Sequence, residues 1–95
     1  MKEAKKMRAL VDEYYSISSI IKNLHSLIRT RAANGFDFVD IDYFRDYTSF
    51  SRKQSQYLAR NPDFTKRICE ILEDEEFAVF HYPNNPETFL LTIKW

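Results

Sequence analysis

The chain has 95 residues, 44% of them hydrophobic, and its fourteen basic side chains balance fourteen acidic ones. This length predicts a single domain, residues 1–95, with enough apolar content to bury a core. The balanced charge excludes the strong positive field typical of dedicated nucleic-acid binders, and the lone cysteine, Cys69, excludes an internal disulfide. No apolar run approaches the roughly 18 residues that span a bilayer, and the start lacks the pattern of a secretory signal. We therefore expect a cytoplasmic protein that does not bind membranes.

The first predicted element is a long helix over residues 10–34. Apolar side chains recur in it at steps of three and four residues, so they share one stripe and are expected to face the core. Residues 1–9 are polar and basic, and are expected to extend this helix or to fray at its start. His25 lies beside the stripe, and the sequence places no catalytic partner next to it. The members of the stripe are Leu10, Tyr14, Ile17, Ile21, Leu24, Leu27, Ile28 and Ala32.

Asn34–Gly35 is predicted to end this helix, because a glycine adopts a left-handed backbone without a steric penalty. A strand is expected to follow over residues 36–41, with apolar side chains on both faces.

Three aspartates accompany this strand, namely Asp37, Asp40 and Asp42. In an extended chain Asp40 and Asp42 point the same way and could share a divalent cation. The spaced ligands and the glycine of a dedicated calcium loop are missing, so we predict no metal. The favoured interpretation is that Asp42 or Asp46 caps the helix that follows.

Two more helices are predicted, over residues 49–60 and 62–75, with Asn61–Pro62 dividing them. Proline ends the first helix and suits the first turn of the second, where Asn61 would be the N-cap. Thr48 or Ser49 is expected to cap the first of the pair, and Cys69 is expected to be a small buried hydrophobe. The predicted buried positions are Phe50, Gln54, Tyr57 and Leu58, followed by Phe64, Ile68, Ile71 and Leu72.

The last predicted element is a hairpin of two strands, 77–82 and 89–95, around the turn-forming residues 83–87. Alternate residues of the second strand, from Phe89 through Leu91 and Ile93 to Trp95, are expected to pack, which would tie down the C-terminus. Leu90, Thr92 and Lys94 are expected on a partly wet face. His81 is interpreted as a surface cross-strand contact.

The order of these elements predicts an α+β fold: three main helices and a small three-stranded antiparallel sheet, in the order α-β-α-α-β-β. This order resembles the winged helix-turn-helix architecture, with 49–60 and 62–75 as the paired helices and 83–87 as the wing tip. The resemblance implies that the later helix of the pair would enter the DNA major groove. In that helix Lys66 and Arg67 are followed by a run of acidic side chains, which phosphates would repel.

Short motifs also resemble small accessory proteins of bacteriophages. The resemblance implies a protein of the host cytoplasm that inhibits a host enzyme or defence system, or that sequesters its nucleotide signal. The motifs are Ile28-x-x-x-Ala32-Ala33-Asn34-Gly35, Ile71-Leu72 leading into Phe77-Ala78-Val79, and the closing Ile93-Lys94-Trp95.

Enzymatic activity is the least supported function, because the sequence has no glycine-rich phosphate loop, no Cys/His pair at metal spacing and no nucleophile beside a base. We expect no cofactor. We expect a binding protein that acts on a protein partner, from the host cell if the chain is viral, or on itself as a homo-oligomer, since fifteen aromatic residues offer interface anchors.

The alternative is an anion-binding module for a nucleotide or a nucleic acid, with Tyr57 or Tyr47 as a stacking surface. The residues expected to bind the anion or the partner are Arg52, Lys53, Gln56, Tyr57, Arg60, Lys66 and Arg67.

Overall fold

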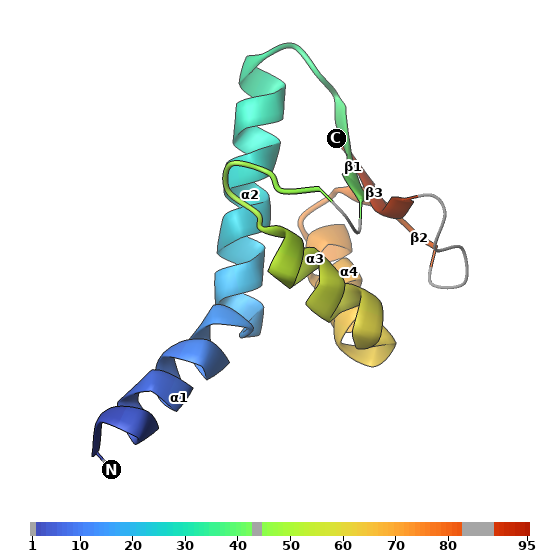
Figure 1. The fold of residues 1–95 in the computed structure, drawn as a ribbon. Helices are drawn as coiled ribbons and strands as arrows, with labels where there is room; N and C mark the ends of the chain where they lie inside the picture. The colour runs from blue at the N-terminus through green and yellow to red at the C-terminus, as the bar shows by residue number, and fades with distance from the viewer. Residues whose placement is uncertain (1, 43–44, 83–88) are drawn as a thin grey trace.

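The computed structural model describes residues 2–42, 45–82 and 89–95 (Figure 1). The fold of this part of the chain is α+β, as predicted, with four helices rather than three main ones. The segment 1–9 extends the first helix, from Lys2 onward. The elements in chain order are α1 (Lys2–Tyr14), α2 (Ile17–Ala33), β1 (Phe38–Asp42), α3 (Arg52–Arg60), α4 (Pro62–Asp74), β2 (Ala78–His81) and β3 (Phe89–Lys94).

The three strands form one antiparallel sheet in the order β1-β3-β2, which confirms the predicted sheet. The register between β1 and β3 shifts between Ile41 and Asp42, as at a β-bulge. Leu90 lies beside this irregularity and is buried, together with its neighbour Leu91. The prediction that Leu90 faces a wet surface is therefore wrong, since the bulge re-aims a side chain that strict alternation would place outside. The predicted turn 83–87 lies outside the described residues.

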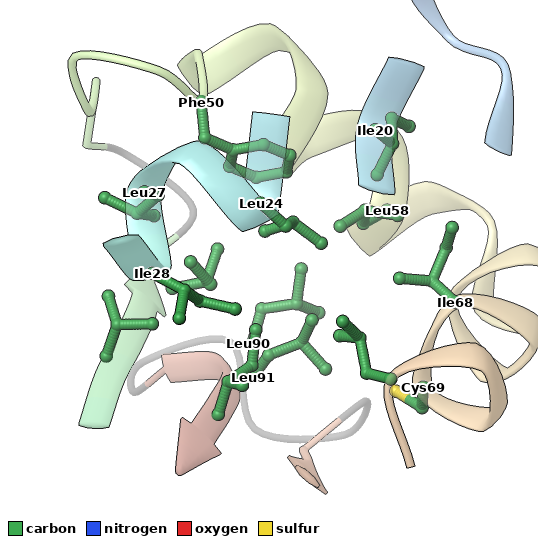
Figure 2. Close-up of a cluster of buried hydrophobic side chains, with 14 residues drawn as sticks. Ile20, Leu24, Leu27, Ile28, Phe50, Leu58, Ile68, Cys69, Leu90 and Leu91 are labelled. Atoms are coloured by element: carbon green, nitrogen blue, oxygen red, sulfur yellow. The ribbon is translucent and has the colours of Figure 1, made fainter. Parts of the chain in front are cut away.

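The core lies where α2, α3 and α4 meet the sheet, with α2 packed on β1 and α4 packed on β2. Figure 2 shows Leu24 of α2, Leu58 of α3, Ile68 of α4 and Leu91 of β3 converging in this cluster. All four side chains are fully buried. Most positions predicted to be buried in the paired helices are so, and Phe64, Tyr57 and Ile71 are half-buried at their edge.

The first helix is not continuous, contrary to the prediction. Ser16 has an extended backbone (φ −72°, ψ 157°) and is the N-cap of α2. Its hydroxyl accepts a hydrogen bond from the Ser19 N–H at 3.2 Å and donates one to the Glu13 carbonyl at 2.7 Å. A serine side chain that bonds to the backbone in this way competes with the helix, and here it ends one helix and begins another.

The break removes the start of the predicted stripe from the core. No residue of α1 is buried, and Figure 1 shows α1 extending away from the other helices and the sheet. Leu10, Tyr14 and Ile17, which the stripe predicts to be buried, are 58%, 37% and 36% exposed. Ala32, at the other end of the stripe, is also exposed.

Two predicted helix starts differ in their capping bonds. The N-cap of α3 is Ser51 rather than Thr48 or Ser49, and its hydroxyl accepts from the Gln54 N–H at 3.3 Å. Asn61 is the N-cap residue of α4, as predicted, but its side chain makes no capping bond. Its amide instead donates to the carbonyl of residue 57 at 2.8 Å, which completes the end of α3.

The predictions that a glycine ends the second helix and that the C-terminus is tied down are confirmed. Gly35 follows α2 with a φ of +87°, the left-handed conformation for which only glycine is well suited. The backbone N–H of Trp95 donates to the carbonyl of Asp37 at 2.9 Å, so the C-terminal backbone is tied to the strand region. The prediction that the Trp95 side chain packs is wrong, because this residue is 36% exposed.

Candidate functional site

An apolar face on α1 stays uncovered in the described part of the chain. Met7, Val11 and Tyr14 recur at steps of four and three residues, Ala4 extends this row by three, and Leu10 lies beside it. Met7, Leu10 and Val11 are 53%, 58% and 54% exposed. A helix of thirteen residues is near the lower length limit for stability in water, and most helices in proteins depend on a packed apolar face. This exposed row makes α1 the main candidate for a binding surface.

The charges of α1 oppose its own dipole. The last turn carries no basic residue but does carry Asp12 and Glu13, near the partially negative end of the helix. The first turn holds one acidic residue, Glu3, which forms a 3.5 Å ion pair with Lys6 between two exposed side chains. Such a pair contributes little. The partially positive end therefore has an excess of basic side chains: Lys2, Lys5, Lys6 and Arg8.

One buried amide helps to set the direction in which α1 leaves the body, that is, α2, α3, α4 and the sheet. Gln54 of α3 is fully buried, and its Nε2 donates to the carbonyl of Tyr14 at 2.9 Å. Its Oε1 accepts from Nδ2 of Asn23, on α2, at 3.0 Å. The phenolic hydroxyl of Tyr14 also hydrogen-bonds to Oγ of Ser51. The end of α1, the middle of α2 and the start of α3 thus share one polar junction.

Stacked aromatic rings hold the same corner from the other side. The ring of Tyr15 stacks on that of Tyr57, with centroids 4.7 Å apart and planes at 23°. Tyr57 in turn packs edge-on against Phe64 of α4, with centroids 5.2 Å apart. The corner between α1 and α2 therefore contacts α3 directly, and Tyr57 links it to α4.

An open hollow of about 410 Å³ continues the apolar face of α1 onto the body. It lies at the corner where α1 meets α3, and α1 contributes most of its apolar lining. The lining residues are Leu10, Val11, Tyr14, Tyr15 and Lys53.

The predicted anion-binding residues lie on α3 and α4, and their charged members are all exposed. Gln56 is half-buried. Arg67 already has an acidic neighbour, because Oε2 of Glu70 lies 3.5 Å from its guanidinium. The Tyr57 ring stacks on that of Tyr15 and packs edge-on with that of Phe64, so one of its faces is already occupied within the fold. The exposed members are Arg52, Lys53, Arg60, Lys66 and Arg67.

The other predicted stacking ring, Tyr47, has a structural role. Its hydroxyl donates to the Asp40 carbonyl at 2.6 Å and accepts from the Asp42 N–H at 3.1 Å. The guanidinium of Arg45 lies 5.8 Å from its ring centroid. Tyr47 thereby joins the end of β1 to the segment before α3.

The aspartates of β1 do not gather into a metal site in the described residues, where no group of three or more possible ligands occurs. Oδ1 of Asp40 accepts from the hydroxyl of Thr92 on β3 at 2.6 Å. Oδ1 of Asp46 accepts from the Arg52 N–H at 2.7 Å, at the start of α3. Asp46 therefore satisfies one backbone N–H at the start of α3, as the capping interpretation expects, although the N-cap residue itself is Ser51.

The fold gives His25 a partner that sequence reasoning missed. Nε2 of His25 on α2 lies 2.9 Å from Oε1 of Glu75, just after α4, and both side chains are partly exposed. The pair borders an open hollow of about 310 Å³ whose other lining residues are Ile28, Arg29 and Phe77. These five residues include no hydroxyl or thiol, so the hollow offers no nucleophile for the histidine to activate. The signal was not visible in sequence because fifty residues separate the two partners.

Cys69 and His81 are also not arranged as reactive groups. Cys69 is buried, as predicted, and burial raises the pKa of its thiol to about 11, with the nearby Glu73 carboxylate adding to the shift. His81 pairs with Leu91 in the sheet register and is half-buried, where the prediction has it on the surface. Burial lowers the pKa of His81 below its usual value.

Comparison with known protein families, characterised proteins and solved structures gives no match. Within the described residues, no helix combines the length and the apolar character needed to cross a membrane.

Proposed function

We propose that this chain is a small, non-enzymatic protein-binding module that recognises its partner through α1. The observation that carries the proposal is the exposed apolar row of Met7, Leu10, Val11 and Tyr14 on a helix with no buried residue. Burying such a side chain fully contributes about 1.5–3 kcal/mol. Contact with a partner would supply the packed face that α1 lacks within its own chain.

The way α1 is held supports binding as a preformed helix. The junction at Gln54 and the Tyr15–Tyr57 stack fix the C-terminal end of α1 before any partner arrives. A binding element that is already oriented loses less conformational entropy when it binds. An amphipathic helix that lays its apolar face into a groove is a common mode of protein recognition. If the partner is a host protein, as the phage resemblance implies, α1 would be the segment that contacts it.

The anion-binding alternative has less support. Both rings that a nucleotide would stack on already have neighbours within the fold: Tyr57 contacts two other rings, and the guanidinium of Arg45 lies 5.8 Å from the centroid of Tyr47. The basic side chains of α3 and α4 are spread over exposed helix surface, where solvation accounts for them. We therefore assign these residues no ligand.

Affinity capture with the full chain tests the proposal. We compare the wild type with Leu10→Asp, which places a charge on the apolar face, and with Ala9→Asp, which places the same charge on the opposite side of α1. We expect the wild type and the Ala9 variant to capture a partner in stoichiometric amount, either a second copy of the chain or a different protein. The Leu10 variant should no longer capture it. Equal retention by both variants, or no captured protein and no self-association for the wild type, contradicts the proposal. Circular dichroism confirms that each variant is folded.

A further inference from the structure

We propose that the partner of α1 is a second copy of this chain, and that the two α1 helices pair antiparallel about a twofold axis. The axis crosses the apolar face at the level of residue 9, and the Ala9 side chain itself points away from the interface. This inference rests on the proposed function and names its partner. It follows from two properties of α1: the spacing of its apolar side chains and the direction of its charges.

The apolar row of α1 matches itself when one copy is reversed. Ala4, Met7, Val11 and Tyr14 follow steps of three, four and three residues, which is the spacing of a coiled-coil seam. In an antiparallel pair centred on Ala9, Met7 lies opposite Val11 of the second copy, and Ala4 lies opposite Tyr14. A small side chain then faces a large one at each end, as close packing requires, and twofold symmetry repeats each contact.

The charges favour this orientation over the parallel one. The first two turns of α1 are basic and the last turn is acidic, so reversal of one copy brings unlike charges together at both ends of the pair, while the two Arg8 side chains approach each other at its centre. A parallel pair would place the basic turns of both copies side by side. Helical spacing puts Arg8 and Asp12 on one flank of the seam, and Lys6 and Glu13 on the other. In the antiparallel register each of these basic side chains lies within a turn of the second copy's acidic one.

The antiparallel pair also corrects the arrangement that is unfavourable in a lone α1. The N-terminal end of each helix, with its partial positive charge, gains Asp12 and Glu13 of the second copy as neighbours. The C-terminal end gains that copy's lysines. Charges that are unfavourable for the dipole of their own helix are therefore favourable for the dipole of the second copy's helix.

The shape of the molecule leaves room for this pairing. In the described residues the body holds the C-terminal end of α1, through the Gln54–Tyr14 hydrogen bond and the Tyr15–Tyr57 stack next to it. Figure 1 shows the N-terminal turns of α1 standing clear of the body. With the axis near Ala9, the two bodies would lie at opposite ends of the helix pair. A pair of helices about 20 Å long is a small interface, so we expect a dissociation constant in the micromolar range, on the order of 1–100 μM.

Sedimentation equilibrium of the full chain over about 1–500 μM tests the dimer. We expect the mass to rise from 11.4 kDa toward twice that value. Val11→Asp should weaken self-association at least about tenfold, and Ala9→Asp should leave it unchanged. A wild type that remains monomeric at the highest concentration overturns the inference. If α1 then still captures a different protein, the proposed function survives while this inference fails.

Disulfide trapping tests the orientation. Chains carrying Met7→Cys and chains carrying Val11→Cys are mixed in equal amounts and oxidised gently, and the products are identified by intact mass. The native Cys69 is buried and does not compete. The antiparallel register predicts mixed 7–11 dimers in several-fold excess over 7–7 and 11–11 dimers. An excess of the like dimers, or no more mixed dimer than random pairing of the two chains gives, overturns the antiparallel assignment even if the chain proves to be dimeric.

Discussion

At the scale of single residues, Gln54 links three helices through one side chain. It is a polar side chain at a fully buried position, and both ends of its amide are hydrogen-bonded to other helices. Its place in the apolar stripe of α3 could be predicted from spacing. The partners could not, because Tyr14 and Asn23 lie 40 and 31 residues away.

Replacing Gln54 with leucine should lower the free energy of unfolding by about 1–3 kcal/mol, because it leaves the Tyr14 carbonyl and the Asn23 amide without their partner. Urea unfolding measures the change. Gln56→Ala, on the same helix at a half-buried position, is the control and should stay within about 0.5 kcal/mol of the wild type. Equal unfolding midpoints for the two variants would mean that the buried junction contributes nothing.

The thiol of Cys69 makes stability depend on pH in the alkaline range. Burial raises its pKa from 9.0 to about 11, so the unfolded chain loses this proton at a lower pH than the folded chain does. The stabilisation is complete below pH 9 and is lost as the pH rises from about 9 through 11. In Cys69→Ala the free energy of unfolding should fall less steeply across this window. Parallel curves for the variant and the wild type would contradict the assigned shift.

At the scale of elements, local chemistry predicts the paired helices well and the first helix poorly. Pro62 lacks a backbone N–H and restricts the residue before it, so the boundary between α3 and α4 is visible in the sequence. The boundary at Ser16 is not, because Leu10, Tyr14, Ile17 and Ile21 keep a helical spacing across it. Two contacts from α3 accompany the break, the Gln54–Tyr14 hydrogen bond and the Tyr15–Tyr57 stack. The spacing of apolar residues carries no information about them.

The turn after α2 requires a left-handed backbone at Gly35. Its φ is +87°, and a Cβ added there would meet no atom within 4 Å. Gly35→Ala should therefore destabilise the protein by about 1–2 kcal/mol through backbone strain, with no steric contribution. Gly35→Asn should cost less, because asparagine tolerates the left-handed region. Thermal unfolding distinguishes them, and an alanine variant as stable as the wild type would rule out the strain.

At the scale of the whole molecule, one part of the predicted apolar stripe lies in the core and the other part forms the candidate binding surface. The stripe from Ile21 to Ile28 packs on the sheet, and the part before the break remains outside. The longest dimension of the molecule is 47 Å against 30 Å and 25 Å for the others. The fold class could be predicted from element order, whereas the binding surface could not, because an exposed stripe and a buried one look alike in sequence.

Two substitutions on the predicted stripe should change the free energy of unfolding by very different amounts. Leu10→Ala should change the free energy of unfolding of the monomer by less than about 0.5 kcal/mol, because Leu10 is 58% exposed. Leu24→Ala should cost about 2–5 kcal/mol, because Leu24 is fully buried. Chemical denaturation at low protein concentration measures both. Similar losses in the two variants would mean that α1 packs against the body.

The reversed polarity of α1 has a consequence for how electrolytes act on this segment. For most surface helices, dissolved counterions screen an attraction between terminal side chains and the peptide groups, and helicity falls. In α1 they screen a repulsion. A synthetic peptide of residues 1–15 should therefore gain ellipticity at 222 nm as sodium chloride is added, and lose this response when Lys5 and Lys6 are exchanged with Asp12 and Glu13.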